Sequence, residues 1–240
     1  MFFLFVFAKK IDKRERAVIE LKRYKCGRMD TMIKIDKIQV MNLENAMRGA
    51  RNPLNSWARS DSYYDEDGNF CLGQNDISLG SRLARAGSDH RKFLRQIFVS
   101  LDIYAPLYWW KEFDTYKVGT VANSCSTMHK IQAKEFTRED FSHDRMTEDA
   151  LAVLDTTIAF LEKERVRFVE TKERDAWHNM IQLLPSSYNQ LRTVSLNYEV
   201  LMNIYYARRH HKLAEWHELC RVIEGLPFAK ELILIKGDEE

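Results

Sequence analysis

The sequence predicts an α+β fold in which helices pack on a mixed or antiparallel sheet. Segments with the period of two that is typical of strands are interspersed with segments of helical periodicity, and the two do not alternate regularly as βαβ units would. The chain has 240 residues, of which 45% are hydrophobic, and it contains only 4 prolines and 9 glycines. This composition supports a real core and argues against disordered, collagen-like and linker-rich classes.

Three segments are expected to be strands. Ile33–Val40 alternates apolar and polar residues, Gln96–Ile103 is apolar and β-prone before Pro106, and Gln190–Leu196 alternates again. Because helices separate these strands along the chain, the sheet is expected to form from distant parts of the sequence.

Helices are predicted where apolar residues recur at helical spacing between capping residues and a Gly or Pro stop. In chain order they are Leu43–Arg51, Ile77–Ala86, a short helix capped by Ser88 and Asp89, Leu107–Phe113, Thr147–Glu170, Asp175–Leu184, Asn197–Arg208 and Ala214–Glu224. Leu107–Phe113 is aromatic on nearly all sides, so we expect it either deep in the core or in a subunit interface. Between the helices, Asp65–Asn69 is expected to be a turn and Asp114–Lys130 a polar loop, a kind that often carries function.

The positive charge of the chain lies at its N-terminus. The formal net charge is +2, but residues 1–31 hold nine Lys/Arg and four Asp/Glu, a net of +5 that leaves −3 for residues 32–240. We therefore expect residues 1–31 to be a basic appendage on a single domain at 32–240. A short amphipathic helix at 11–30 and a membrane-surface anchor are alternatives for this segment. Bulk binding of nucleic acid by the domain is disfavoured.

The compartment is expected to be the cytoplasm. The apolar run Met1–Ala8 is far shorter than a bilayer span, and its charge follows the run rather than preceding it as in a secretory signal. The four cysteines form no CxxC pair, which indicates reduced thiols.

No metal or P-loop site is predicted. Asp65, Asp67 and Asn69 have the spacing of a calcium loop, but Phe70 stands where such a loop needs glycine. The histidines at 210, 211 and 217 lack the paired ligands of a zinc site, and no glycine-rich phosphate loop exists. Cys125 and His129 are four residues apart, a spacing that would pair them on a helix, but no third orienting residue is apparent.

The helix at 197–208 carries the most informative pattern. Asn197 and Arg208 are eleven residues apart, which places them about 20° apart around a helix and three turns apart along it. An amide and a guanidinium on one face can hold a planar ring and a phosphate, and a solvated face is the alternative.

These residues resemble the C-terminal half of the flavin-dependent thymidylate synthases. Leu184-Pro185, the alternating strand and the helix NYEVLMNIYYAR follow the order of that family, whose helix carries two asparagines six apart and an arginine five residues further on, as Asn197, Asn203 and Arg208 do here. The resemblance covers roughly residues 32–225 and extends to phage and prophage proteins of that superfamily. It implies the same fold, with the asparagines contacting FAD and Arg208, beside Arg209, holding the nucleotide.

The family's second motif falls on residues 115–127 with many changes. The resemblance implies cofactor contacts from Tyr116 and Lys117 and, upstream, from His90 and Gln96; substrate contacts from Thr120 and Asn123; and catalytic roles for Cys125, Ser126 and Arg208. Thr115, Thr127 and Glu199 stand where the family has arginines. Each lost arginine removes charge-assisted bonds worth about 1.5–3 kcal/mol. The cations left to compensate are Lys117, Arg208, Arg209, Arg48, Arg51 and Arg91.

The activity implied is FAD-mediated one-carbon transfer from methylenetetrahydrofolate, with NADPH as reductant, onto a deoxyuridine monophosphate-like pyrimidine nucleotide. The family forms homotetramers with shared sites, and the aromatic run Tyr104–Phe113 also favours an interface. The alternative is a catalytically lapsed member of the fold that acts as a nucleotide- or protein-binding phage accessory factor. A nucleic-acid-binding protein that uses the basic N-terminus is a third reading.

Overall fold

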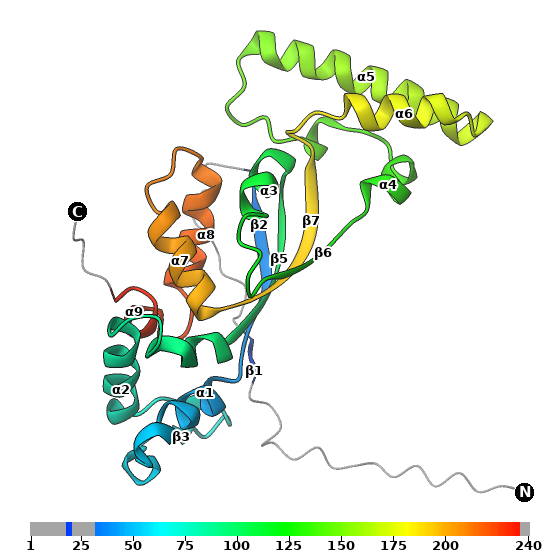
Figure 1. Cartoon of the computed structure of the whole chain (residues 1–240). Coiled ribbons are helices and arrows are strands. Elements are labelled where there is room, and N and C mark those ends of the chain that lie inside the picture. The colour runs from blue at the N-terminus through cyan, green and yellow to red at the C-terminus, as the bar shows by residue number, and fades with distance from the viewer. Residues whose placement is uncertain (1–17, 21–31, 236–240) are drawn as a thin grey trace, which may run out of the picture.

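A computed structural model describes residues 18–20 and 32–235 of the chain, and its centre is a five-stranded antiparallel sheet (Figure 1). The strand order is β1-β2-β5-β7-β6. The strands are β1 Val18–Glu20, β2 Lys34–Met41, β5 Phe98–Pro106, β7 Asn189–Asn197 and β6 Val121–Ser124, and a separate pair joins β3 Tyr63–Tyr64 to β4 Phe70–Cys71. The nine residues of β5 and of β7 pair along their whole length. The α+β class and the three predicted strands are confirmed.

Helices surround the sheet, mostly as the sequence pattern indicates. They are α1 Leu43–Ala50, α2 Gln74–Arg85, α3 Leu107–Phe113, α4 Thr127–Lys130, α5 Glu148–Thr171, α6 Arg174–Leu183, α7 Tyr198–Arg208, α8 Ala214–Glu224 and α9 Ala229–Leu232. Short 3₁₀ helices are η2 Asn52–Leu54, η3 Trp57–Arg59, η4 Arg91–Gln96, η5 Ile131–Ala133 and η6 Arg138–Asp140. Among the described residues, none of these helices has the length and hydrophobicity that crossing a membrane requires.

The main core lies on the face of the sheet that α3, α7 and α8 cover (Figure 1). Trp109, Trp110 and Phe113 of α3 are fully buried there, and Trp109 packs against Trp216 of α8 with ring centroids 4.7 Å apart. The aromatic run of α3 is thus buried within one chain. Of the two places predicted for this run, the core and a subunit interface, the structure shows the core for these three rings.

A second, smaller core lies in the hairpin of α5 and α6, which projects from the end of the sheet (Figure 1). Leu154 and Leu161 of α5 belong to this core, together with Met180 of α6 and Phe141, which precedes α5. Thr147 caps α5 by accepting a hydrogen bond from the Ala150 N–H at 3.4 Å, and Lys172 ends it in the left-handed conformation.

The structure differs from the sequence expectations in two segments. Residues 114–130 are not one loop, since β6 pairs with β7 at the edge of the sheet and α4 follows. Within residues 11–30, Val18–Glu20 is a strand paired with β2 rather than helix; the rest of residues 1–31, with the appendage and anchor predictions, lies outside the described residues. The turn at Asp65–Asn69 is confirmed, since Asp65 accepts a hydrogen bond from the Asn69 N–H at 2.7 Å.

Candidate functional site

The residues singled out by the sequence fall in three places. His90 and Gln96 lie on either end of η4. Tyr116, Lys117, Thr120, Asn123, Cys125 and Ser126 lie on the segment that leads from α3 through β6 to α4, and Asn197, Asn203, Arg208 and Arg209 lie along α7 and its two ends. The structure joins the second and third groups at both ends of α7.

His90 and Gln96 line the same pocket, which we call the η4 pocket. Its volume is about 720 Å³, and its other walls include Ala50, Pro53, Leu54, Leu79, Leu83 and Phe93. A pocket of this size with mostly apolar walls and a few polar groups is typical of small-molecule sites. Gln96 can lie close to α1 because residue 49 is glycine: a Cβ there would stand 3.1 Å from the Gln96 Oε1. The structure therefore brings these two predicted cofactor residues together.

Asn197 sits at the start of α7, where it caps the helix. Its Oδ1 accepts a hydrogen bond from the Val200 N–H at 3.1 Å, and the residue is buried. Its Nδ2 lies against Gly119, where a Cβ would come within 2.9 Å of that nitrogen and where φ is +75°. Only glycine suits both demands at position 119. The hydroxyl of Thr120 is also buried and finds no partner among the described residues.

Replacing Asn197 by alanine is expected to lower the free energy of unfolding by about 1 kcal/mol, because the cap of α7 is lost. Asn197→Asp should keep most of the stability, since a carboxylate caps equally well. Urea unfolding measures both. Asn203→Ala is the matched control: Asn203 is exposed and has no side-chain hydrogen bond among the described residues. Equal stabilities of Asn197→Ala and Asn203→Ala would contradict a capping role.

Glu199, which replaces an expected arginine, is paired with two other arginines. Its buried carboxylate accepts hydrogen bonds from the Nε of Arg91 at 3.1 Å and from the Nε of Arg95. Burial acts to raise the pKa of Glu199, but the hydrogen bonds and charges of Arg95 and Arg91 outweigh it, so the pKa lies below its usual value. Two cations thus stand next to the position where the resemblance expects one.

Arg208, at the end of α7, is already engaged by its own chain. Its Nη1 donates to the Glu112 Oε2 at 2.9 Å, its Nε donates to the Tyr116 hydroxyl at 2.9 Å, and its guanidinium lies 4.7 Å from the ring centroid of Trp216. The Trp216 indole N–H donates to the same Glu112 oxygen at 3.1 Å. Glu112 was not predicted as a partner of Arg208, because the two residues lie on α3 and α7, far apart along the chain.

Cys125 and Ser126 have structural roles at the end of β6. The backbone N–H of Cys125 donates to the Leu191 carbonyl at 2.9 Å, and its carbonyl accepts from Gln190 at 2.7 Å. The Ser126 hydroxyl caps α4 by accepting from the His129 N–H. Because α4 begins after Cys125, the thiol is not paired with His129 on one helix. None of the described contacts of Arg208 involves either predicted catalytic residue.

The other cations differ in how far they are engaged. Arg51 is buried, with its Nε 2.6 Å from the Asp76 Oδ1, so it serves the fold. Arg48 is exposed and donates to the Asn45 side chain, and Lys117 is exposed on the loop between α3 and β6. Arg209 lies over the Tyr206 ring at 5.2 Å. Asn123 is exposed on β6, opposite Thr193.

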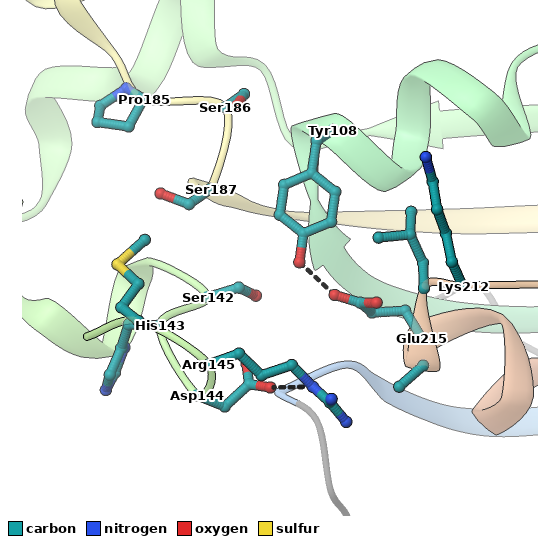
Figure 2. A pocket seen from close by; sticks show the side chains of 13 residues that line it. Tyr108, Ser142, His143, Asp144, Arg145, Pro185, Ser186, Ser187, Lys212 and Glu215 are labelled. Carbon is teal, nitrogen blue, oxygen red and sulfur yellow. Dashed lines mark hydrogen bonds and ion pairs between the residues drawn. The ribbon is translucent and has the colours of Figure 1, made fainter. Parts of the chain in front are cut away.

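A second cavity, which was not predicted from the sequence, lies where α3, residues 142–146, residues 185–187 and the start of α8 meet (Figure 2). We call it the α8 pocket; it has a volume of about 520 Å³ and is lined by Tyr108, Ser142, Ser187, Lys212 and Glu215, among others. Tyr108 lies one turn before Glu112 on α3, and its hydroxyl is hydrogen-bonded to the Glu215 carboxylate. Burial, and then this bond, raise the pKa of Tyr108 well above its usual value. The buried Ser187 hydroxyl has no partner among the described residues.

Comparison with known proteins places the fold. No family model and no curated protein matches the sequence. The structure is similar to the flavin-dependent thymidylate synthase ThyX from Helicobacter pylori complexed with FAD and dUMP, with a TM-score of 0.60, 18% identity and coverage of 81% of this chain and 94% of that one. It is also similar to the UMP/dUMP methylase PolB from Streptomyces cacaoi bound with 5-Br dUMP, with a TM-score of 0.60, 13% identity and coverage of 88% and 97%. The fold that the resemblance implied is confirmed.

Proposed function

We propose that this chain binds FAD and a pyrimidine nucleoside monophosphate and acts as a flavin-dependent thymidylate synthase-like enzyme. The η4 pocket carries the proposal, because it brings His90 and Gln96 together on a fold whose solved examples hold FAD with dUMP. Methylenetetrahydrofolate as carbon donor, NADPH as reductant and a cytoplasmic location belong to the same proposal.

The η4 pocket fits a flavin in size and chemistry. Its apolar walls suit a flat ring system, and Gln96, His90 and Lys92 supply hydrogen-bonding groups at its edge. Bound FAD would supply the redox and group-transfer chemistry, while the protein orients the ring and keeps water from it. Asn197 caps α7 and packs against Gly119, and it is not among the residues that line this pocket.

The absorption spectrum of the purified protein tests the proposal directly. We expect flavin absorbance, either as purified or after FAD is added and the excess removed. Quenching of flavin fluorescence on titration gives the affinity. A wild-type protein that neither carries nor takes up FAD contradicts the proposal.

The geometry around Arg208 favours a second candidate, a catalytically lapsed member that binds a nucleotide or a protein. Glu112, Tyr116 and Trp216 occupy the guanidinium that the resemblance assigns to the nucleotide. Growth of a thymidine-requiring host on this gene distinguishes the two: rescue supports the enzyme, and failure of a well-expressed, FAD-loaded protein supports the lapsed member.

A homotetramer with shared sites is the proposed assembly. The α5–α6 hairpin presents exposed apolar side chains, namely Val153, Phe160, Val166, Val169 and Leu183, that a second copy would cover. Light scattering at micromolar concentration checks the assembly, and a monomer contradicts it.

A further inference from the structure

We infer that Arg91 and Arg95, held by Glu199 and flanked by Lys92, form an anion site at the edge of the η4 pocket that takes the diphosphate of a dinucleotide. The inference rests on the proposed function, since it assigns the cations that hold the phosphates of FAD. It also explains Glu199, which stands where the resemblance expects an arginine.

The two guanidinium groups are oriented by one carboxylate. Both direct their Nε toward Glu199, at 3.1 Å for Arg91. The Arg95 Nη2 also donates to Glu199, at 3.4 Å, and the Arg91 Nη1 contacts the Met202 sulfur at 3.7 Å. Among the described residues, this leaves the Nη1 of Arg95 and the Nη2 of Arg91 as the terminal groups for an anion. The side chain of Glu199 is only 12% exposed, whereas that of Arg95 is 54% exposed. The mostly buried Glu199 carboxylate therefore fixes the orientation of the exposed Arg95 guanidinium.

The charge count favours an anion at this point. Two guanidinium groups share one carboxylate, so the Arg91–Glu199–Arg95 cluster keeps one net positive charge. Lys92 adds a second, and Asp89, the other acid whose charge reaches Arg95, offsets one of them. Guanidinium groups bind phosphate oxygens through paired N–H donors, so two of them suit the two phosphates of a diphosphate.

The geometry of η4 joins this cluster to the pocket. Residues three apart in a 3₁₀ helix lie on the same side, so Arg95 stands one turn beyond Lys92. Lys92 lines the η4 pocket, and Gln96, next to Arg95, lines it too. Arg91 and Arg95 stand outside the lining of this mostly apolar cavity, so the cluster is joined to it through their sequence neighbours Lys92 and Gln96. A flat ring beside an anion describes a nucleotide or dinucleotide rather than a free metabolite acid.

Titrations with riboflavin, FAD and inorganic diphosphate test the site. Arg95→Gln and Arg91→Gln are expected to weaken FAD binding about tenfold to a hundredfold, the loss of one or two charge-assisted bonds. Riboflavin, which has no phosphate, should bind these variants as it binds wild type, and diphosphate affinity should fall with that for FAD. Arg85→Gln is the matched control, because this arginine on α2 is exposed and makes no side-chain hydrogen bond or ion pair among the described residues. Thermal melting verifies that each variant is folded.

The outcomes separate this inference from the proposed function. If FAD binds wild type and both arginine variants equally, or if riboflavin weakens by the same factor, the anion site is wrong while the flavin proposal stands. If no flavin binds but diphosphate binds and requires Arg95, the anion site stands and the flavin proposal fails. If wild type binds neither flavin nor diphosphate, the inference is overturned.

Discussion

Asp76→Ala is expected to lower the free energy of unfolding by about 3–5 kcal/mol, because it leaves the Arg51 guanidinium buried without its counter-ion. The two side chains are 1% and 5% exposed, and the Arg51 Nε lies 2.6 Å from the Asp76 Oδ1. Ser60 and Ser62 donate to the other Asp76 oxygen at 2.6 and 2.5 Å. This carboxylate therefore ties the segment after α1 to the first turn of α2, and so supports the walls on which the η4 pocket depends.

The Asp155–Arg138 pair is a matched control for this substitution. Its side chains are 46% and 44% exposed, so Asp155→Ala should cost no more than about 1 kcal/mol. Urea unfolding followed by circular dichroism measures both variants. A cost for Asp76→Ala as small as that for Asp155→Ala would contradict the counter-ion argument.

The same carboxylate makes the stability depend on acid pH. Burial acts to raise the pKa of Asp76, but hydrogen bonds from Ser60, Ser62 and Arg51 outweigh it and hold the pKa below its usual value. A lowered folded-state pKa stabilises the fold above the unfolded value of about 3.9, and this contribution is lost as the pH falls through the folded pKa. The difference between wild type and Asp76→Ala should therefore shrink below about pH 4.

The sequence predicted those elements whose pattern is set by burial. β5 was recognisable as an apolar, β-prone run, in which Val99 and Leu101 are buried, and β7 was recognisable by its alternation, in which the buried Val194 and Leu196 flank the exposed Ser195. β6 was missed because all four of its residues are exposed at the edge of the sheet, where no apolar alternation is required. A strand stabilised only by its backbone ladder leaves little trace in side-chain type.

The sequence predicted the candidate residues on α7, but it did not predict the side chains that contact them. The spacing of Asn197, Asn203 and Arg208 pointed to α7, and the structure confirms that all three belong to this helix or its cap. From the sequence, Glu199 indicated only the loss of an expected arginine, because Arg91 and Arg95 lie more than a hundred residues away along the chain. Ion pairs between distant elements form through tertiary packing, which local spacing does not encode.

Glu112→Gln is expected to strengthen the binding of dUMP about tenfold to a hundredfold, because it releases the charge of Arg208 for a phosphate. Glu112 holds the Arg208 Nη1 at 2.9 Å and also meets the Nε2 of His211 at 3.4 Å. A bound nucleotide must therefore displace a carboxylate to reach the guanidinium. Glutamine keeps the shape of the side chain and an oxygen for the Trp216 indole N–H, so Arg208 should stay in place between Tyr116 and Trp216.

A double-mutant cycle on Glu112 and Arg208 shows where the gain in affinity originates. Calorimetric titration with dUMP should find the gain in Glu112→Gln abolished when Arg208→Gln is added. Asp114→Asn is the matched control, because it removes a second carboxylate at the end of α3 that pairs with Arg192 instead, at 2.7 Å. If Asp114→Asn strengthens binding as much as Glu112→Gln does, general charge explains the gain. If the gain survives the loss of Arg208, that arginine is not the group that meets the phosphate.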